Sequence, residues 1–184
     1  MSDEQDVRAP GPGPPRRIWF ERKFELGLPP DAFADVLERI RGTPARLEER
    51  IMMLPGEAFD RRFGESWTIQ ENVGHLLDLE PLWAGRLQEL LGGDEALRPA
   101  DLENRKTHEA EHDQTPMDEL LAAYRREREA IVRRLDALVP SDLHRTALHP
   151  RLLQPMTVVD LFFFVAEHDD HHLARIGELA KLAS

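Results

Sequence analysis

The sequence of 184 residues contains no cysteine, and this absence narrows the chemistry that the protein can perform. A chain without cysteine forms no disulfide, offers no thiolate to a metal ion and has no cysteine nucleophile. A metal site in this chain must therefore be built from histidine, aspartate or glutamate side chains. The absence of cysteine also fits a reducing compartment.

Long apolar runs are missing as well. No segment approaches the roughly 20 apolar residues that span a membrane, and the N-terminal stretch MSDEQDVRAPGPGPPRR lacks the apolar core of a secretory signal. We expect residues 1–17, rich in proline and glycine, to form a disordered tail. Residues 18–184 are long enough for a single domain with its own core. The expected location is the cytoplasm, with no membrane partner.

Positive charge is scarce relative to negative charge. The chain has 24 lysine and arginine residues against 35 aspartate and glutamate residues, which gives a formal net charge of −11 at pH 7. An acidic chain of this kind has no overall attraction for a phosphate backbone. We therefore expect no nucleic-acid partner.

Helical spacing of apolar residues occurs in four segments, whereas no segment shows the sustained alternation that marks a strand. The first helical segment runs from Asp31, a candidate N-cap, to about Leu54. We expect a kink near Gly42, because Pro44 has no N–H to donate along the helix.

The other three segments begin at recognisable caps. Thr68 and Glu71 have the spacing of a capping box at the start of the second segment, which ends before a glycine pair. The third begins with Thr115 as N-cap and Pro116 at the first helical position.

The fourth segment begins at Thr157 and runs to about Leu182. Long connections, residues 92–114 and 139–156, separate the second segment from the third and the third from the fourth. Four amphipathic helices of this length predict an all-α fold, a four-helix bundle.

The fourth segment carries a dense cluster of ionisable residues, AEHDDHHLARI, directly after the apolar run LFFF. His168 and His172 are four residues apart, so they differ by about 40° in direction and lie one turn apart. They continue the apolar stripe of the helix, whereas Asp170 points away and His171 lies about 60° to one side. Because an unpaired polar group in a core costs about 1–3 kcal/mol, these nitrogens should have a partner.

A third imidazole is available in the second segment, where His75 lies among apolar residues in ENVGHLLDLE. Alone, such a histidine is more often a hydrogen-bonded core residue than a ligand. Combined with an inward His-x3-His pair on another helix, it favours a metal site. Three imidazoles leave positions open for water or substrate, as in catalytic sites. They accept zinc, nickel, iron or manganese, with zinc and nickel favoured.

A second histidine pair lies in residues 108–112, HEAEH, which match the zinc-protease signature H-E-x-x-H. In that signature both histidines lie on a half-buried amphipathic helix, whereas the surroundings here, DLENRKTHEAEHDQTP, are almost wholly polar. We therefore expect a solvated loop or a short surface helix. His108 and His112 then belong to the rim of the pocket or to a dimer surface.

The chain resembles the DinB-like superfamily, also called DinB/YfiT-like, over roughly residues 18–182. The resemblance is carried by the stretches RKFELGLPPDAF, LERIRGTPARLEE, SWTIQENVGHLLDLEPLW, NRKTHEAEH and TVVDLFFFVAEHDDHHLARI. It implies a bundle with up-down-down-up connectivity and a metal ion held by His75, His168 and His172. It also implies a homodimer, since members of the family are often dimeric.

The resemblance further implies an activity, because characterised relatives include S-transferases and isomerases that use small thiol cofactors. The first hypothesis is therefore a metal-dependent enzyme that joins a low-molecular-weight thiol to a small-molecule substrate. Basic residues such as Arg105, Lys106, Arg151 or Arg175 are candidates for holding an acidic cofactor. The alternatives are a metal-dependent hydrolase that activates water and a non-catalytic, metal-binding stress-response protein.

Three acids are candidates for orienting the metal ligands or for moving protons. Glu71 and Asp78 flank His75 at helical spacing, and Asp169 neighbours His168. Metal-bound histidines usually donate their second ring nitrogen to such groups. Asp78 is favoured because its i+3 spacing places it beside His75.

Overall fold

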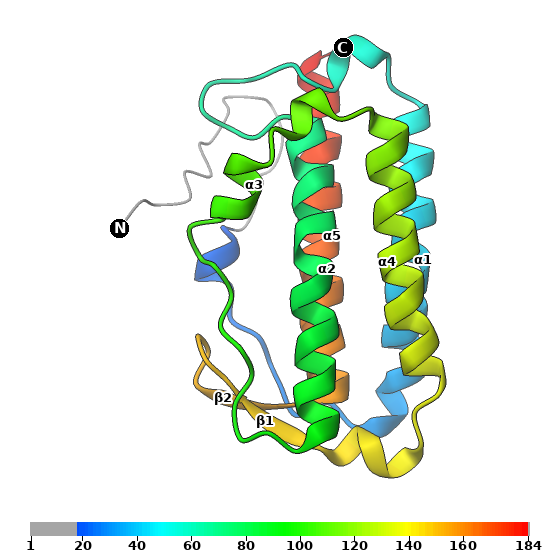
Figure 1. Ribbon diagram of the computed structural model, residues 1–184, viewed down its shortest axis with the longest axis vertical. Helices are drawn as coiled ribbons and strands as arrows, with labels where there is room; N and C mark the ends of the chain where they lie inside the picture. Colours follow the sequence, from blue (N-terminus) through cyan, green and yellow to red (C-terminus); the bar gives the residue numbers. More distant parts are fainter. Residues whose placement is uncertain (1–17, 184) are drawn as a thin grey trace.

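The computed structural model describes residues 18–183, and the expected disordered tail at residues 1–17 lies outside this range. Four long helices form the body of the molecule (Figure 1): α1 (Phe33–Met52), α2 (Ile69–Gly92), α4 (Met117–Asp136) and α5 (Val158–Ala183). Their apolar stripes face inward and form the core. None of the helices in this part of the chain is long and apolar enough to cross a membrane.

The four helices run up, down, down and up in chain order (Figure 1). α1 packs against α4 and α5, and α2 packs against the same two helices, so α1 and α2 occupy diagonally opposite corners. The predicted four-helix bundle with up-down-down-up connectivity is confirmed. In this order α2 and α4 are parallel neighbours, and a parallel pair requires a connection that returns along the length of the bundle.

The connection from α2 to α4, residues 93–116, supplies that return along the outside of α2 (Figure 1). It carries α3 (Arg105–Glu109) and the 3-10 helix η4 (His112–Gln114), and both pack against α2. The connection from α4 to α5 does not run along the bundle, because the last residue of α4 and the first residue of α5 lie at the same end of the bundle (Figure 1). Four more 3-10 turns complete the helical elements: η1 (Trp19–Glu21), η2 (Pro30–Ala32), η3 (Gly56–Ala58) and η5 (Pro140–His144).

The predicted capping box of α2 is confirmed. Thr68 Oγ1 accepts the backbone N–H of Glu71 at 3.0 Å, and the Glu71 carboxylate accepts the backbone N–H of Thr68 at 2.8 Å. α5 begins in the same way, because Thr157 and Asp160 exchange the equivalent hydrogen bonds. Both helices that carry the candidate metal ligands therefore start at positions that the sequence specifies.

The other two long helices start one or two residues later than predicted. Asp31 does not cap α1, because it lies in the turn η2 and the backbone is already helical before Phe33. An N-cap needs an extended backbone, which is absent there. α4 begins at Met117, and Pro116 takes the N-cap position predicted for Thr115, because the ψ angle of Pro116 is 135°. α1 continues as helix through Pro44.

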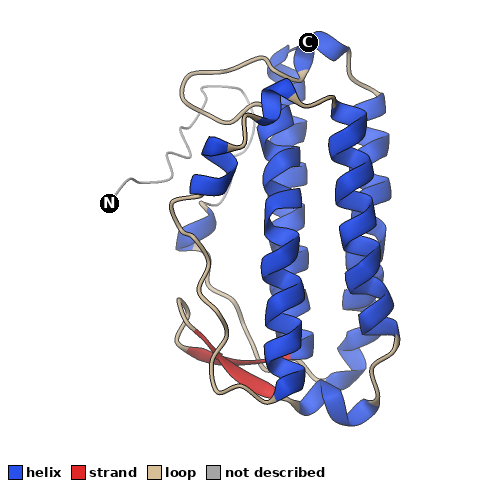
Figure 2. Ribbon diagram, in the orientation of Figure 1, coloured by secondary structure: helices blue, strands red, loops and turns tan. Residues whose placement is uncertain are grey.

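A short antiparallel hairpin, β1 (Thr146–His149) with β2 (Gln154–Thr157), lies beside one end of the bundle, next to α2 (Figure 2). It corrects the prediction of a connection without strands between α4 and α5. Strands of four residues are too short to give a sustained alternation of apolar residues. The hairpin also hydrogen bonds to the α2–α4 connection, since Leu97 donates its backbone N–H to the oxygen of Leu148 at 3.0 Å.

The core falls into two apolar clusters. One cluster includes the first half of α5 up to Ala166, and the other includes α5 from Leu173 onward. On α2, which runs in the opposite direction to α5, the first part of the helix, up to Leu76, belongs to the second cluster. The later part of α2, from Trp83 onward, belongs to the first cluster. The histidines of both helices thus lie where the two clusters meet.

Candidate metal centre

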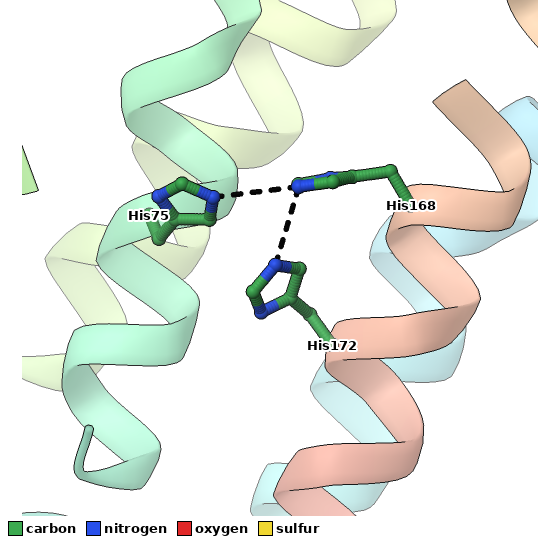
Figure 3. Close-up of side chains that lie close together, drawn as sticks. All are labelled: His75, His168 and His172. Carbon is green, nitrogen blue, oxygen red and sulfur yellow. Dashed lines mark hydrogen bonds between the residues drawn. The ribbon is translucent and has the colours of Figure 1, made fainter. Parts of the chain in front are cut away.

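Three buried imidazoles converge between α2 and α5 (Figure 3). Nε2 of His168 lies 3.4 Å from Nε2 of His75 and 3.2 Å from Nε2 of His172. One nitrogen from each ring lies within 4.8 Å of the others, and all three residues are at most 6% exposed. The structure therefore brings together the three histidines that the sequence nominates as metal ligands.

A hydroxyl group fixes the protonation of His75. Nδ1 of His75 lies 3.0 Å from Oγ1 of Thr107, and that hydroxyl donates to Oδ2 of Asp78 at 3.0 Å. Because the hydroxyl proton is directed at Asp78, its oxygen accepts the Nδ1–H of His75. Nε2 of His75 then carries a lone pair directed toward the other two rings.

An amide group fixes the protonation of His172 in the same way. Nδ1 of His172 lies 2.9 Å from Oδ1 of Asn72, an atom that only accepts hydrogen bonds. The amide is held in this orientation because its Nδ2 donates to the backbone oxygen of Thr68 at 2.7 Å. Nε2 of His172 therefore also carries a lone pair that faces the cluster.

The third ring, His168, is held by aromatic packing. Its ring centroid lies 5.1 Å from that of Trp19 and 5.8 Å from that of Trp83. Nδ1 of His168 is buried and has no hydrogen-bond partner among the described residues. Burial lowers the pKa of His168 well below its ordinary value and that of His75 to about 4. Neutral rings with converging lone pairs are the donor set that a divalent cation requires, so these residues fit a metal ion.

The cluster lies at the edge of a cavity of about 210 Å³. The cavity is lined mainly by apolar and aromatic side chains, with a few basic ones. The lining residues are Trp19, Phe20, His75, Leu79, Leu82, Trp83, Arg86, Pro99, Ala100, Asp101, Leu102, Asn104, His149, Pro150, Arg151, Phe164, His168, His171 and His172. An apolar cavity with a few convergent polar groups is the usual form of a small-molecule site.

Comparison with known proteins identifies the family. The sequence profile of the DinB superfamily matches residues 39–176, which is most of the chain. The protein belongs to the DinB superfamily. It is similar in fold to YfiT from Bacillus subtilis, described as "a probable metal-dependent hydrolase with an unusual four-helix bundle topology", with a TM-score of 0.77. The two chains are 21% identical, and the match covers 89% of this chain and 94% of YfiT. Among curated proteins, none matches this chain.

In this DinB-superfamily chain, Asp78 joins the metal-ligand candidates to the α2–α4 connection. Its Oδ2 accepts hydrogen bonds from Thr107 and from Nε2 of His112, the latter at 2.8 Å. Lys106 Nζ lies 3.3 Å from Oδ1. Burial alone raises the pKa of Asp78, but the hydrogen bond and charge of His112 bring it below its ordinary value. Asp78 is therefore a carboxylate that acts on His75 through Thr107.

His112 reaches Asp78 because α2 has a glycine at the point of contact. A Cβ atom on Gly74 would lie 2.2 Å from the ring of His112, so any larger residue would displace the ring. His112 is 6% exposed, which corrects the prediction that it lies at a pocket rim or dimer surface. A glycine inside a predicted helix signals a close approach, and Gly74 was the available sequence signal for this contact.

The zinc-protease pattern HEAEH does not form a metal site in the described structure. α3 ends at Glu109, and the backbone of Glu111 is left-handed with a φ of 49°, so the two histidines do not share a helix. His108 is exposed, and its ring lies 5.7 Å from that of Trp67. His171 also lies outside the cluster, with its ring 5.5 Å from that of Trp19.

The other two acids that the sequence nominated have different partners. Glu71 caps α2 and pairs with Arg62 at 2.6 Å. Asp169 is fully buried and pairs with Arg128, which also pairs with Glu80. Among the described residues, neither Glu71 nor Asp169 hydrogen bonds to a histidine of the cluster. Of the three nominated acids, Asp78 alone is connected to a metal-ligand candidate.

Proposed function

We propose that this DinB-superfamily protein binds a divalent metal ion through Nε2 of His75, His168 and His172. We further propose that it is an enzyme whose small-molecule substrate occupies the adjoining cavity. The observation that carries the proposal is the convergence of three buried imidazole rings through their Nε2 atoms. In two of these rings, His75 and His172, the Nδ1 atom is hydrogen bonded to Thr107 and Asn72, respectively. Zinc and nickel are the first candidates, because three imidazoles suit both ions.

The metal ion would supply Lewis-acid activation of a thiol or of water. The chain supplies the positioning. Thr107 and Asn72 keep the protons of His75 and His172 on Nδ1, and this keeps both Nε2 atoms available. The aromatic rings of Trp19, Trp83 and Phe164 line the cavity and give it apolar walls.

The preferred reaction is transfer of a low-molecular-weight thiol to an electrophilic small molecule. The thiol loses its proton, its sulfur forms a bond to the electrophilic carbon, and a leaving group departs from that carbon with the bonding electron pair, so that the leaving group and the proton are released together. The resemblance to thiol-dependent transferases supports this reaction. So does the absence of cysteine, because any sulfur nucleophile must then come from a cofactor.

Hydrolysis is the second candidate function, and one observation favours it. YfiT, which has the same fold, is described as "a probable metal-dependent hydrolase". The two reactions are distinguished by assaying metal-loaded protein on ester, amide and alkyl-halide substrates with and without a panel of small thiols. Turnover only with thiol supports the transferase, and turnover without thiol supports the hydrolase.

The metal site is tested by elemental analysis of the purified protein. We expect about one equivalent of divalent metal per chain in the wild type, a loss in His75→Ala, and no loss in the matched control His171→Ala. Equal metal contents in all three proteins would refute the assignment. Stoichiometric metal without turnover in any assay would instead identify a non-catalytic metal-binding protein.

We also propose that the protein is a homodimer, which the family resemblance supports. Light scattering coupled to gel filtration tests this. A mass near 21.1 kDa, that of one chain, would contradict it.

A further inference from the structure

Arg86 is a buried cation that lines the cavity from α2, and it is 1% exposed. Its guanidinium donates from Nε and Nη2 to the backbone oxygen of Arg98, at 3.0 and 2.9 Å. Nη1 lies 3.1 Å from Nε2 of His149. These acceptors carry no charge, and no carboxylate of the described chain forms an ion pair with Arg86.

A second buried arginine shows how unusual this is. Arg128 is equally buried and pairs with two carboxylates, those of Glu80 and Asp169. Burial alone lowers its pKa, but Asp169 and Glu80 raise it well above the ordinary value. For Arg86 the effect of burial prevails and lowers the pKa to about 10. Burial of a charged group is costly unless an opposite charge is paired with it. Arg128 has two such carboxylate partners, whereas Arg86 has none among the described residues.

His149 does not fill the role of that counter-ion. Donors face both of its ring nitrogens, because Nη1 of Arg86 lies at Nε2 and the backbone N–H of Leu152 lies 3.2 Å from Nδ1. A neutral imidazole accepts at only one nitrogen. One of these two donors is therefore left for another acceptor.

A second cation lines the same cavity. Arg151, in the turn of the β1–β2 hairpin, places its guanidinium carbon 5.2 Å from the ring centroid of Phe20 and 5.9 Å from that of Phe164. Arg86, His149 and Arg151 line the same cavity, and the charge of Arg151 lowers the pKa of the other two groups. The cavity thus has a positive wall formed by α2 and the hairpin.

The acid that lines the described cavity, Asp101, is already bonded. Its carboxylate accepts the backbone N–H groups of Glu103 and Arg105, at 3.2 and 3.0 Å. The acid that acts on Arg86 by charge, Glu89, is held in an ion pair with Arg98. Arg86 therefore lines the cavity without a carboxylate partner among the described residues.

We propose that the cavity binds a small molecule that bears a carboxylate, with this anion held by Arg86 and Arg151. This inference rests on the proposed function, because it names the class of ligand for the same cavity. The guanidinium groups form charge-assisted hydrogen bonds to the carboxylate. The apolar part of the ligand lies along Trp83 and Phe164, and its reactive end faces the three histidines.

The spacing along α2 sets the size of the ligand. Arg86 follows His75 by eleven residues, which is about 16 Å of helix rise. Both side chains line one cavity, with Leu79, Leu82 and Trp83 between them on the same face. The carboxylate and the reactive centre are therefore separated by an apolar spacer of several atoms. The carboxylate belongs either to the substrate or to the thiol cofactor.

The test compares two probes of the same shape, 4-phenylbutyrate and its neutral amide, by titration calorimetry. Full-length protein is used both metal-loaded and chelator-treated, because a carboxylate also binds a metal ion directly. In the chelator-treated wild type we expect the carboxylate to bind about tenfold or more tightly than the amide. Arg86→Met and Arg151→Met should each reduce this preference, whereas the exposed control Arg133→Met should retain it.

Equal affinities of the two probes for the wild type would overturn the proposal, whatever the variants do. This comparison needs no variant, so it decides even if Arg86→Met fails to fold. The outcome is also independent of the metal proposal. A carboxylate preference in protein that takes up no metal supports the anion site alone, and metal uptake without the preference refutes the anion site alone.

A competition experiment assigns the carboxylate to its source. 6-Mercaptohexanoate and 6-mercaptohexanamide are each added to metal-loaded protein before titration with 4-phenylbutyrate, because their chain provides a spacer of several atoms between thiol and carboxylate. Displacement by 6-mercaptohexanoate and not by its amide assigns the site to the thiol cofactor. Retention of 4-phenylbutyrate in the presence of bound 6-mercaptohexanoate assigns the site to the substrate.

Discussion

Oγ1 of Thr107 lies 3.0 Å from Nδ1 of His75, although 32 residues separate them in the chain. This contact joins α3, on the outside of the bundle, to a buried metal-ligand candidate on α2. The same hydroxyl donates to Asp78, so the carboxylate determines the direction of the hydroxyl and the hydroxyl determines the tautomer of His75. The connection that the up-down-down-up order requires therefore also orients the site.

Replacement of Thr107 by valine tests this relationship. Thr107→Val keeps the shape of the side chain and removes the acceptor for Nδ1–H of His75, so we expect metal affinity to fall about 10- to 100-fold. Affinity is measured by competition with a chromophoric chelator. The matched control is Thr43→Val, because buried Thr43 bonds to Asp169 rather than to the histidines. Similar affinities of the two variants would contradict the role of Thr107.

Metal removal should lower thermal stability. A ligand that binds only the folded state at 100 times its dissociation constant stabilises that state by about 2.7 kcal/mol. For a chain of this size that corresponds to a decrease in melting temperature of about 5–10 °C on addition of a chelator. Calorimetry with and without chelator measures it. His75→Ala should show no shift, and an equal shift in this variant would place the metal elsewhere.

Two glycine-to-alanine changes should have opposite effects. A Cβ on Gly74 meets the ring of His112 at 2.2 Å, so Gly74→Ala displaces His112 from Asp78 and should destabilise the protein and weaken metal binding. Nothing lies within 4 Å of a Cβ on Gly42 in α1, so Gly42→Ala should stabilise it by about 0.5–1 kcal/mol. Urea unfolding of both variants provides the measurement. Equal stabilities would show that the ring of His112 is not packed on α2.

The buried ion cluster formed by Arg128 of α4, Glu80 of α2 and Asp169 of α5 should be sensitive to loss of its cation. Arg128→Met leaves the carboxylates of Glu80 and Asp169 buried without a partner, so we expect a loss of about 3–5 kcal/mol in the free energy of unfolding. Arg133→Met, on the exposed face of the same helix, should change stability by less than about 0.5 kcal/mol. Comparable urea midpoints for the two variants would refute the importance of the cluster.

His149 should make the protein sensitive to acid. Burial, with Arg86 and Arg151 nearby, lowers its pKa from 6.5 to about 4. The unfolded chain therefore takes up a proton below pH 6.5 and the folded chain only near pH 4. The stability contributed by neutral His149 is full above pH 6.5 and is lost as the pH falls toward 4.

The variant His149→Gln removes this linkage, so its free energy of unfolding should fall less steeply than that of the wild type between pH 6.5 and about 4. Urea unfolding across this range is the measurement. His144→Gln is the control, because His144 is exposed. Parallel curves for the wild type and His149→Gln would contradict the assigned pKa direction.

Local properties of the chain explain what could be predicted. The helix starts at Thr68 and Thr157 follow from capping boxes that span four residues. The shared direction of His168 and His172 follows from the pitch of one helix. His75 could be nominated because its neighbours on the same helix are apolar. Each of these inferences depends on residues within a few turns of one another.

Contacts that depend on docking could not be predicted. The segment around Thr107 and His112 is polar and looks like a solvated loop, yet both side chains are buried against α2. Asp169 is next to His168 in the sequence, but the helix turns it toward Arg128 on α4. The hairpin was missed because its strands are only four residues long.

The sequence by itself predicted the four helices and nominated the three histidines, because helix periodicity and capping are local, whereas the up-down-down-up order was implied by the family resemblance. The tertiary structure alone decided which polar groups meet those histidines and which charges face the cavity. Thr107 reaches His75 only because the connection packs on α2, and Arg86 faces the same cavity as Arg151 only because the hairpin folds back to it. The energies of such contacts depend on burial and distance, which exist only in the assembled fold.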